Sequence, residues 1–89
     1  MLETLTVRGL IAEHILPPAA GRAPGAIVLR RLEKGAGSFE YVTHFRNDQT
    51  GGYSTGHYFT VWPNDPPFTG ARRLVEAATD FEERAKRGY

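Results

Sequence analysis

The chain has 89 residues, of which 40% are hydrophobic and 24% charged, and its formal net charge is +1. A chain of this length makes one small domain with a limited core, because it buries only roughly 60 to 65% of its unfolded surface. It contains no cysteine, which excludes a disulfide framework, a thiolate nucleophile and any cysteine-based zinc site. A charge so near zero does not by itself indicate nucleic acid as a partner.

The N-terminal segment has none of the features of a secretion signal. Residues 1–16 lack a basic start and a continuous apolar run, and no stretch approaches the roughly 18 apolar residues of a membrane span. We therefore expect a cytoplasmic protein without a membrane partner.

Residues 1–25 are expected to form an N-terminal strand and a loop rich in proline and glycine. The alternating pattern of residues 2–8 favours a strand. Residues 9–16 fit both a helical and a strand periodicity, so their structure stays open. Residues 17–25 contain three prolines and two glycines, which is typical of a connecting loop.

Residues 26–62 predict an antiparallel meander of three strands. Within residues 39–61, two runs rich in β-branched and aromatic side chains flank residues 47–52, whose glycines suit a chain reversal. This pattern predicts a β-hairpin. A second hairpin is expected to turn through residues 34–38.

The second hairpin allows a specific prediction of its register. If Leu32 lies opposite Phe39, then Arg31 faces Glu40 and Leu29 faces Val42, and both of these cross-strand pairs are favourable. We therefore predict this register for the two strands.

Residues 70–87 predict an amphipathic helix, clearest from Arg72 onward. Asp65 and Thr69 are candidate caps at its start, Gly88 is the expected stop, and Asp80 and Arg84 are expected to pair on its charged face. The apolar stripe consists of Leu74, Val75, Ala78, Phe81 and Ala85.

A sheet and an amphipathic helix each have one face to bury, so they most simply bury these faces against each other. The expected fold class is α+β, with an antiparallel sheet of three to four strands and the C-terminal helix packed on one face. The whole chain, residues 1–89, is then a single small domain.

His44 and His57 both lie on the predicted hairpin of residues 39–61 and are the first candidates for chemistry. Side chains alternate along a strand, so the two histidines share a face only if the numbers of paired residues add to an odd value. With Asp48 nearby, they raise the alternative of a metal-dependent hydrolase. Zinc requires at least a third protein ligand, however, and we expect separate histidines and no metal or other cofactor.

Other catalytic patterns are not met by this chain. A hairpin followed by a helix resembles the ββα-metal nucleases in topology, but the predicted helix carries no histidine or asparagine. Residues 51–56 are glycine-rich yet lack the Gly-Lys-Ser/Thr ending of a phosphate loop, so a hairpin turn is expected there. The serines and histidines form no nucleophile motif, and we expect a protein that is not an enzyme.

Aromatic residues interleaved with arginines are the most informative feature of the predicted sheet. Positive charge concentrates there, because residues 26–47 carry four cations against two acids. An exposed face of this kind binds either a protein, which we favour, or single-stranded nucleic acid or RNA. The residues expected to contact the partner are Arg30, Arg31, Arg46, His44, Asp48, Tyr53, His57 and Tyr58.

Several short segments resemble a group of small uncharacterised proteins carried by bacterial plasmids, integrated elements and phages. The segments are Tyr41–His44, Asn47–Gly52, Gly56–Phe59 and Asp80-Phe81 with Arg84. The resemblance implies a mobile-element context, in which such proteins are often anti-defence factors, including CRISPR inhibitors, or accessory regulators. They commonly act by occupying a partner's surface. The oligomeric state stays open, since a free sheet edge can pair two copies into a dimer.

Overall fold

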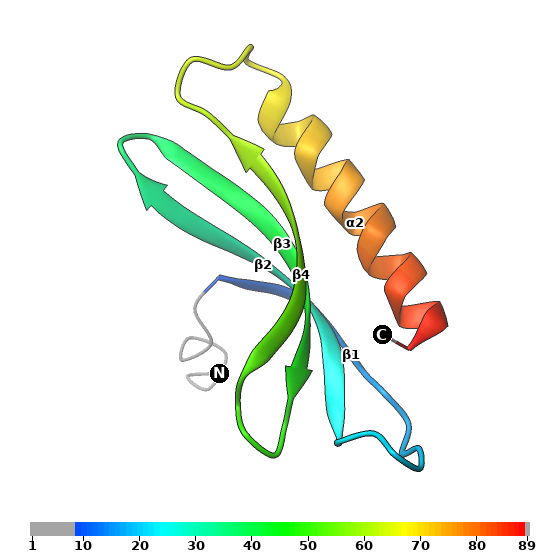
Figure 1. Cartoon of the computed structure of the whole chain (residues 1–89). Coiled ribbons are helices and arrows are strands. Elements are labelled where there is room, and N and C mark those ends of the chain that lie inside the picture. Colours follow the sequence, from blue (N-terminus) through cyan, green and yellow to red (C-terminus); the bar gives the residue numbers. More distant parts are fainter. Residues whose placement is uncertain (1–8, 89) are drawn as a thin grey trace.

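The computed structural model describes residues 9–88, which form one antiparallel sheet and one helix (Figure 1). The strands are β1 (Leu10–Ile15), β2 (Gly25–Gly35), β3 (Ser38–Asn47) and β4 (Tyr53–Val61), and they pair in the order β1-β2-β3-β4. The helix, α2 (Thr69–Arg87), lies along one face of the sheet and contacts β2, β3 and β4. The predicted α+β fold, a sheet of three to four strands with the C-terminal helix on one face, is confirmed.

Most of the ambiguous residues 9–16 form the strand β1, because pairing with β2 satisfies their backbone groups. A bulge interrupts β1 between Leu10 and Ala12. The proline-rich segment that follows is a loop, closed where the amide of Leu16 donates to the carbonyl of Gly25 at 2.9 Å. The strand predicted at residues 2–8 lies outside the described residues.

The predicted register between β2 and β3 is wrong. Glu33 rather than Leu32 lies opposite Phe39, and Arg31 lies opposite Tyr41. The turn is shorter than the expected residues 34–38, because only Ala36 and Gly37 connect the two strands. Their φ angles are +54° and +82°. A further irregularity between Glu33 and Gly35 sets the final register, which places odd-numbered residues of β2 and β3 on the face toward α2.

The predicted hairpin between β3 and β4 is confirmed, and its register separates the two histidines. From Phe39 opposite Val61 to Thr43 opposite His57, the paired numbers add to an even value, so His44 and His57 lie on opposite faces. A bulge opposite His44 then shifts the pairing so that Tyr53 lies opposite Arg46. Both tyrosines on β4, Tyr53 and Tyr58, consequently lie on the same face as His44.

The core lies between α2 and the sheet. Leu29, Tyr41 and Ala77 are buried there, and Leu74 and Phe81 pack against them as the apolar stripe predicted. Val75 does not belong to this face, since it is 65% exposed and its predicted place is taken by Ala77 and Arg84. Ala77 and Arg84 lie seven residues apart, so they share one side of the helix with Leu74 and Phe81, and this side includes a charged residue that the apolar pattern left out.

The ends of α2 differ in how well sequence predicted them. The helix begins at Thr69 with Phe68 as N-cap and without a side-chain cap, while Asp65 accepts a hydrogen bond from the Trp62 amide in the preceding loop. Gly88 ends the helix in the left-handed conformation as predicted, donating its amide to the Arg84 carbonyl at 2.7 Å. Among the described residues, no helix has the length and apolarity to cross a membrane.

The turn between β2 and β3 generates a test of the fold. Ala36 has a positive φ, which costs an L-residue roughly 1 to 2 kcal/mol, while asparagine tolerates this region and precedes glycine in favoured two-residue turns. We expect Ala36→Asn to raise the free energy of unfolding by roughly 0.5 to 1 kcal/mol and Ala36→Val to lower it. Urea denaturation measures both, and equal stability of the two variants would contradict the turn geometry.

Candidate functional site

A polar network lies inside the interface between α2 and the sheet. Arg84 is only 1% exposed, and its Nη1 donates to the carbonyl of Thr43 at 3.1 Å and to the Thr43 hydroxyl at 3.3 Å. That hydroxyl donates to Oδ2 of Asp80 at 2.5 Å. Nδ1 of His57 lies 2.9 Å from the same oxygen. Sequence placed Asp80 and Arg84 on a charged outer surface, whereas both side chains in fact turn toward the sheet.

The network keeps Asp80 ionised. Burial of the carboxyl acts to raise its pKa, but the hydrogen bonds from Thr43 and His57 and the charges of His57 and Arg84 together outweigh burial. The pKa of Asp80 therefore lies below its ordinary value. Burial also lowers the pKa of Arg84, although the Asp80 carboxylate opposes that change.

The contact of His57 with Asp80 has the form of a histidine oriented by a carboxylate, but its surroundings favour a structural role. The hydroxyl in the network belongs to Thr43, which is buried and donates to Asp80, so it is not available to a substrate. His44 lies on the other face and cannot join His57 at a metal. Within residues 9–88, no group of three or more His, Cys, Asp and Glu side chains is placed to hold a metal ion.

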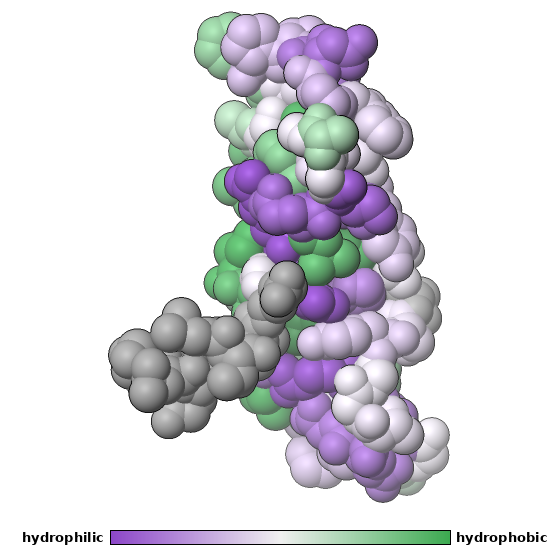
Figure 2. Space-filling model, turned by 90° about the vertical axis from the view of Figure 1, so that its left-hand side faces the viewer, coloured by the Kyte–Doolittle hydropathy of each residue, from purple (hydrophilic) through white to green (hydrophobic). Residues whose placement is uncertain are grey.

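The sheet face turned away from α2, which we call the outer face, carries a cluster of one arginine and three aromatic rings. The guanidinium of Arg30 lies 4.4 Å from the centre of the Tyr53 ring. The His44 imidazole lies 4.9 Å from Tyr53 and 6.1 Å from Tyr58, which meets it edge-on. We call these four residues the aromatic cluster. Figure 2 shows hydrophobic and hydrophilic residues interleaved on this side of the molecule.

Local backbone features position the aromatic cluster. Alternation along β2 and β3 points Arg30 and His44 outward, and the bulge in β4 returns Tyr53 to the same face. Gly56 makes room for the next ring, because a Cβ at this position would lie 2.7 Å from the ring of Tyr58. A side chain at Gly56 would therefore displace Tyr58.

Arg46 and Asp48, also predicted to contact a partner, bind each other instead. Nε of Arg46 lies 2.6 Å from Oδ1 of Asp48, and Nη1 pairs with Glu13 on β1. The hydrogen bond to Asp48 raises the pKa of Arg46, and the one to Glu13 adds to this effect despite partial burial. These ion pairs join β1 to the end of β3, so Arg46 and Asp48 have a structural role.

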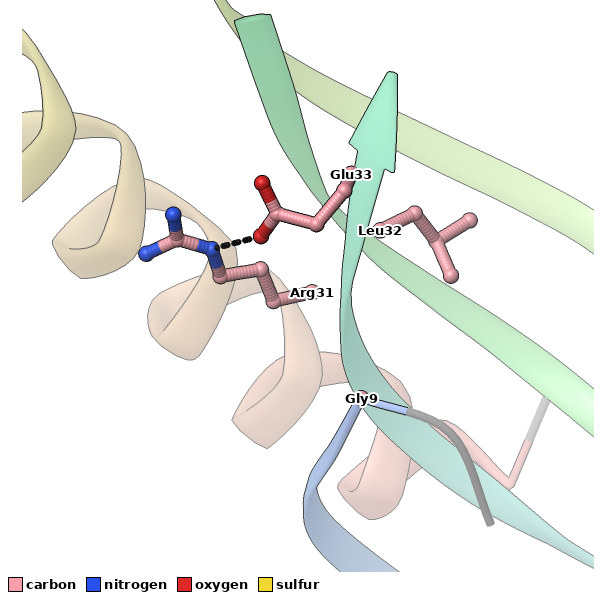
Figure 3. Close-up of a pocket in the computed structure, with 4 residues that line it drawn as sticks. All are labelled: Gly9, Arg31, Leu32 and Glu33. Atoms are coloured by element: carbon pink, nitrogen blue, oxygen red, sulfur yellow. Dashed lines mark hydrogen bonds and ion pairs between the residues drawn. The ribbon is translucent and has the colours of Figure 1, made fainter. Parts of the chain in front are cut away.

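Arg31 lies on the face toward α2, with its guanidinium 3.7 Å from the centre of the Phe39 ring and 2.7 Å from Glu33. Figure 3 shows Arg31 and Glu33 on one side of β2 and Leu32 on the other, around a pocket that Gly9 also lines. The pocket measures about 280 Å³, below the roughly 300 to 1,000 Å³ of small-molecule sites, and its arginine is already paired. It does not present a ligand site.

The structure brings four of the eight predicted contact residues together in the aromatic cluster. Arg46 lies on the same outer face but is paired with Glu13 and Asp48, while Arg31 and His57 lie on the face toward α2.

The structure also adds exposed apolar side chains that sequence analysis did not select. Trp62, directly after β4, is 59% exposed, and Ile11 and Ile15 on β1 are exposed as well. The isoleucines were missed because the helical alternative for residues 9–16 left their orientation open.

The buried network predicts a large difference between two neighbouring arginines of α2. We expect Arg84→Met to lower the free energy of unfolding by about 2 to 4 kcal/mol. The substitution removes the buried positive charge near Asp80 and the two hydrogen bonds that Arg84 donates to Thr43. Arg87→Met should change it by less than about 0.5 kcal/mol, since the pair of Arg87 with Glu83 is exposed. Denaturant titration of both variants checks this, and similar losses would contradict the network.

The lowered pKa of Asp80 predicts a pH-dependent contribution to stability. Its carboxyl protonates at lower pH in the folded than in the unfolded chain, so the stabilisation is full above the ordinary value of 3.8 and is lost as pH falls through the folded pKa. We expect the stability difference between the wild type and Asp80→Asn to be largest near neutral pH and to shrink below about pH 4. Denaturation across pH measures it, with Glu82→Gln as an exposed control. A constant difference would mean that Asp80 is not held as a carboxylate.

Comparison with known proteins adds no relative to this picture: no family model matches the chain, and neither a curated protein nor a solved structure matches it. The candidate site therefore rests on its own geometry. Its most distinctive surface is the aromatic cluster of the outer face.

Proposed function

We propose that this protein is a non-enzymatic binding module of the cytoplasm that docks a partner protein on its outer face. The observation that carries the proposal is the stacking of Arg30 on Tyr53 beside His44 and Tyr58. Tyr58 is 57% exposed, and Trp62, directly after β4, is 59% exposed. Arginine, tyrosine and tryptophan are the side chains that most often dominate the energy of protein interfaces.

The ion pairs of the sheet favour a protein over nucleic acid. A phosphate backbone is bound by several cations spaced along a groove. Arg31 and Arg46, two of the three arginines considered for that task, are bound to Glu33 and to Glu13 and Asp48. Phosphate contacts would have to break these pairs. Exposed tyrosines remain suited to stacking on bases, so binding of single-stranded nucleic acid or RNA is the alternative that the test must separate.

The expected partner follows from the resemblance to proteins of bacterial mobile elements. Such proteins commonly occupy a surface of a host complex. We therefore propose a host protein as the partner, for example a component of a defence system, which would make this chain an anti-defence factor such as a CRISPR inhibitor. This role requires a rigid contact surface and no chemistry, in agreement with the structural roles of the His57 and Arg46 clusters.

The experiment is an affinity capture from a bacterial host lysate, with and without nuclease, at low and high salt. We expect a protein that is retained after nuclease treatment and at high salt, and that is lost with Tyr58→Ser combined with Trp62→Ser. Gly56→Ala should weaken capture too, because its Cβ displaces the Tyr58 ring without removing an aromatic residue. Val75→Ser is the matched control, since Val75 is at least as exposed as the two aromatic residues but lies on α2.

Two outcomes would contradict the proposal. Recovery of nucleic acid alone, lost at high salt, would assign the outer face to phosphate-driven binding. If capture is unaffected by the Tyr58 and Trp62 substitutions but abolished by Val75→Ser, the interface lies on α2 and not on the outer face.

A further inference from the structure

The two edge strands of the described sheet, β1 and β4, differ in how their outward backbone groups are used. An edge strand points the amide and carbonyl of every second residue away from its neighbouring strand. On β4, Nε of Arg73 lies 3.4 Å from the Thr60 carbonyl oxygen, and the Trp62 amide donates to Asp65 at 2.8 Å. Another strand could pair with this end of β4 only by displacing these side chains.

The hydrogen bonds of β1 identify its outward groups as those of Glu13 and Ile15. The Leu16 amide donates to the Gly25 carbonyl at 2.9 Å, so the backbone of Leu16 faces β2. Alternation along the strand makes His14 face β2 as well. Glu13 and Ile15 therefore point their amides and carbonyls to the edge of the sheet. In the described part of the chain, no strand pairs with this side of β1.

The side chains along this edge do not protect it from pairing. Ile15 is 60% exposed and Ile11 is 49% exposed. The charge of Glu13 between them is compensated by Arg46 of the same chain. β1 contains neither proline nor lysine, which commonly keep edge strands apart, and α2 packs mainly over the other three strands. The edge of β1 thus combines outward backbone groups with exposed apolar side chains.

We propose that β1 pairs with β1 of a second copy of this chain, antiparallel and around a two-fold axis, with Glu13 opposite Ile15 of the second copy. In this register the two residues exchange both of their backbone hydrogen bonds, and symmetry repeats the exchange. A register centred on Glu13 would instead place two carboxylates directly opposite each other, which is unfavourable. The inference is independent of the proposed function.

The small size of the contact predicts a weak dimer. β1 has six residues, whereas a standard stable interface has roughly 20 to 30 residues on each side. We therefore expect a Kd of about 10 to 100 µM. Two-fold pairing keeps both helices on one face of the joined sheet and both aromatic clusters on the other. The dimer presents the outer face twice.

Sedimentation of the intact chain over a range of concentrations tests the dimer. We expect the average mass to rise with concentration toward twice the monomer value. Ile15→Pro should weaken association at least about tenfold, because it removes an outward amide from each copy and spares the ladder with β2. Thr60→Pro is the matched control, since it removes an outward amide from the edge of β4 and should leave association unchanged. Circular dichroism verifies that both variants are folded.

Cysteine crosslinking tests the register without a proline. The chain contains no cysteine, so each variant carries a single thiol. In the proposed register the His14 residues of the two copies lie opposite each other as a non-hydrogen-bonded pair, with about 4.5 Å between their Cα atoms. This distance is within reach of a disulfide. Under mild oxidation we expect His14→Cys to form a covalent dimer faster than Glu13→Cys and much faster than Thr60→Cys.

Three results would overturn the proposed dimer. A monomer mass at every concentration up to about 1 mM would show that β1 does not pair with itself. Association lost with Thr60→Pro but retained with Ile15→Pro would place the contact on β4. Faster crosslinking of Glu13→Cys than of His14→Cys would reject the pairing of Glu13 with Ile15.

Discussion

A guanidinium buried between a helix and a sheet is the constraint on which this structure depends. Arg84 of α2 bonds to Thr43 in the central strand β3, and Thr43 in turn bonds to Asp80 one helical turn earlier. Breaking one part leaves a buried charge or hydroxyl without a partner, so the helix is held at one rotation and one height over the sheet. The apolar contacts around Leu29 and Tyr41 supply the hydrophobic stabilisation, but they do not fix the position as narrowly.

The two faces of the sheet differ in how their polar groups are used. The face beneath α2 uses its polar groups internally, and His57 completes that arrangement through Asp80. Within residues 9–88, the outer face has no helix over it, and its rings and arginine are organised by the bulge in β4 and by the space above Gly56. A small domain therefore combines a rigid interior with one chemically distinct surface, which is what a binding module requires.

The proposed interface depends on aromatic rings that the sheet leaves exposed. Exposed rings such as that of Tyr58 supply the area that a partner would bury. Arg31 and Arg46 show why counting charges on a sheet is not enough. Each is engaged by a carboxylate of the same chain, so neither is an isolated cation on the sheet.

The sequence by itself determined the kinds of elements and their order. The glycines of residues 47–52, the alternation of β3 and β4 and the stripe with Leu74 and Phe81 are local signals, and each predicted its element. Tertiary structure alone decided which side chains share a surface. Side chains alternate with a period of two, so the short turn at Ala36 and the bulge in β4 each move every later residue to the opposite face. Local periodicity likewise treats Arg84 as a surface residue, because only contact with Thr43 on another element makes its burial favourable.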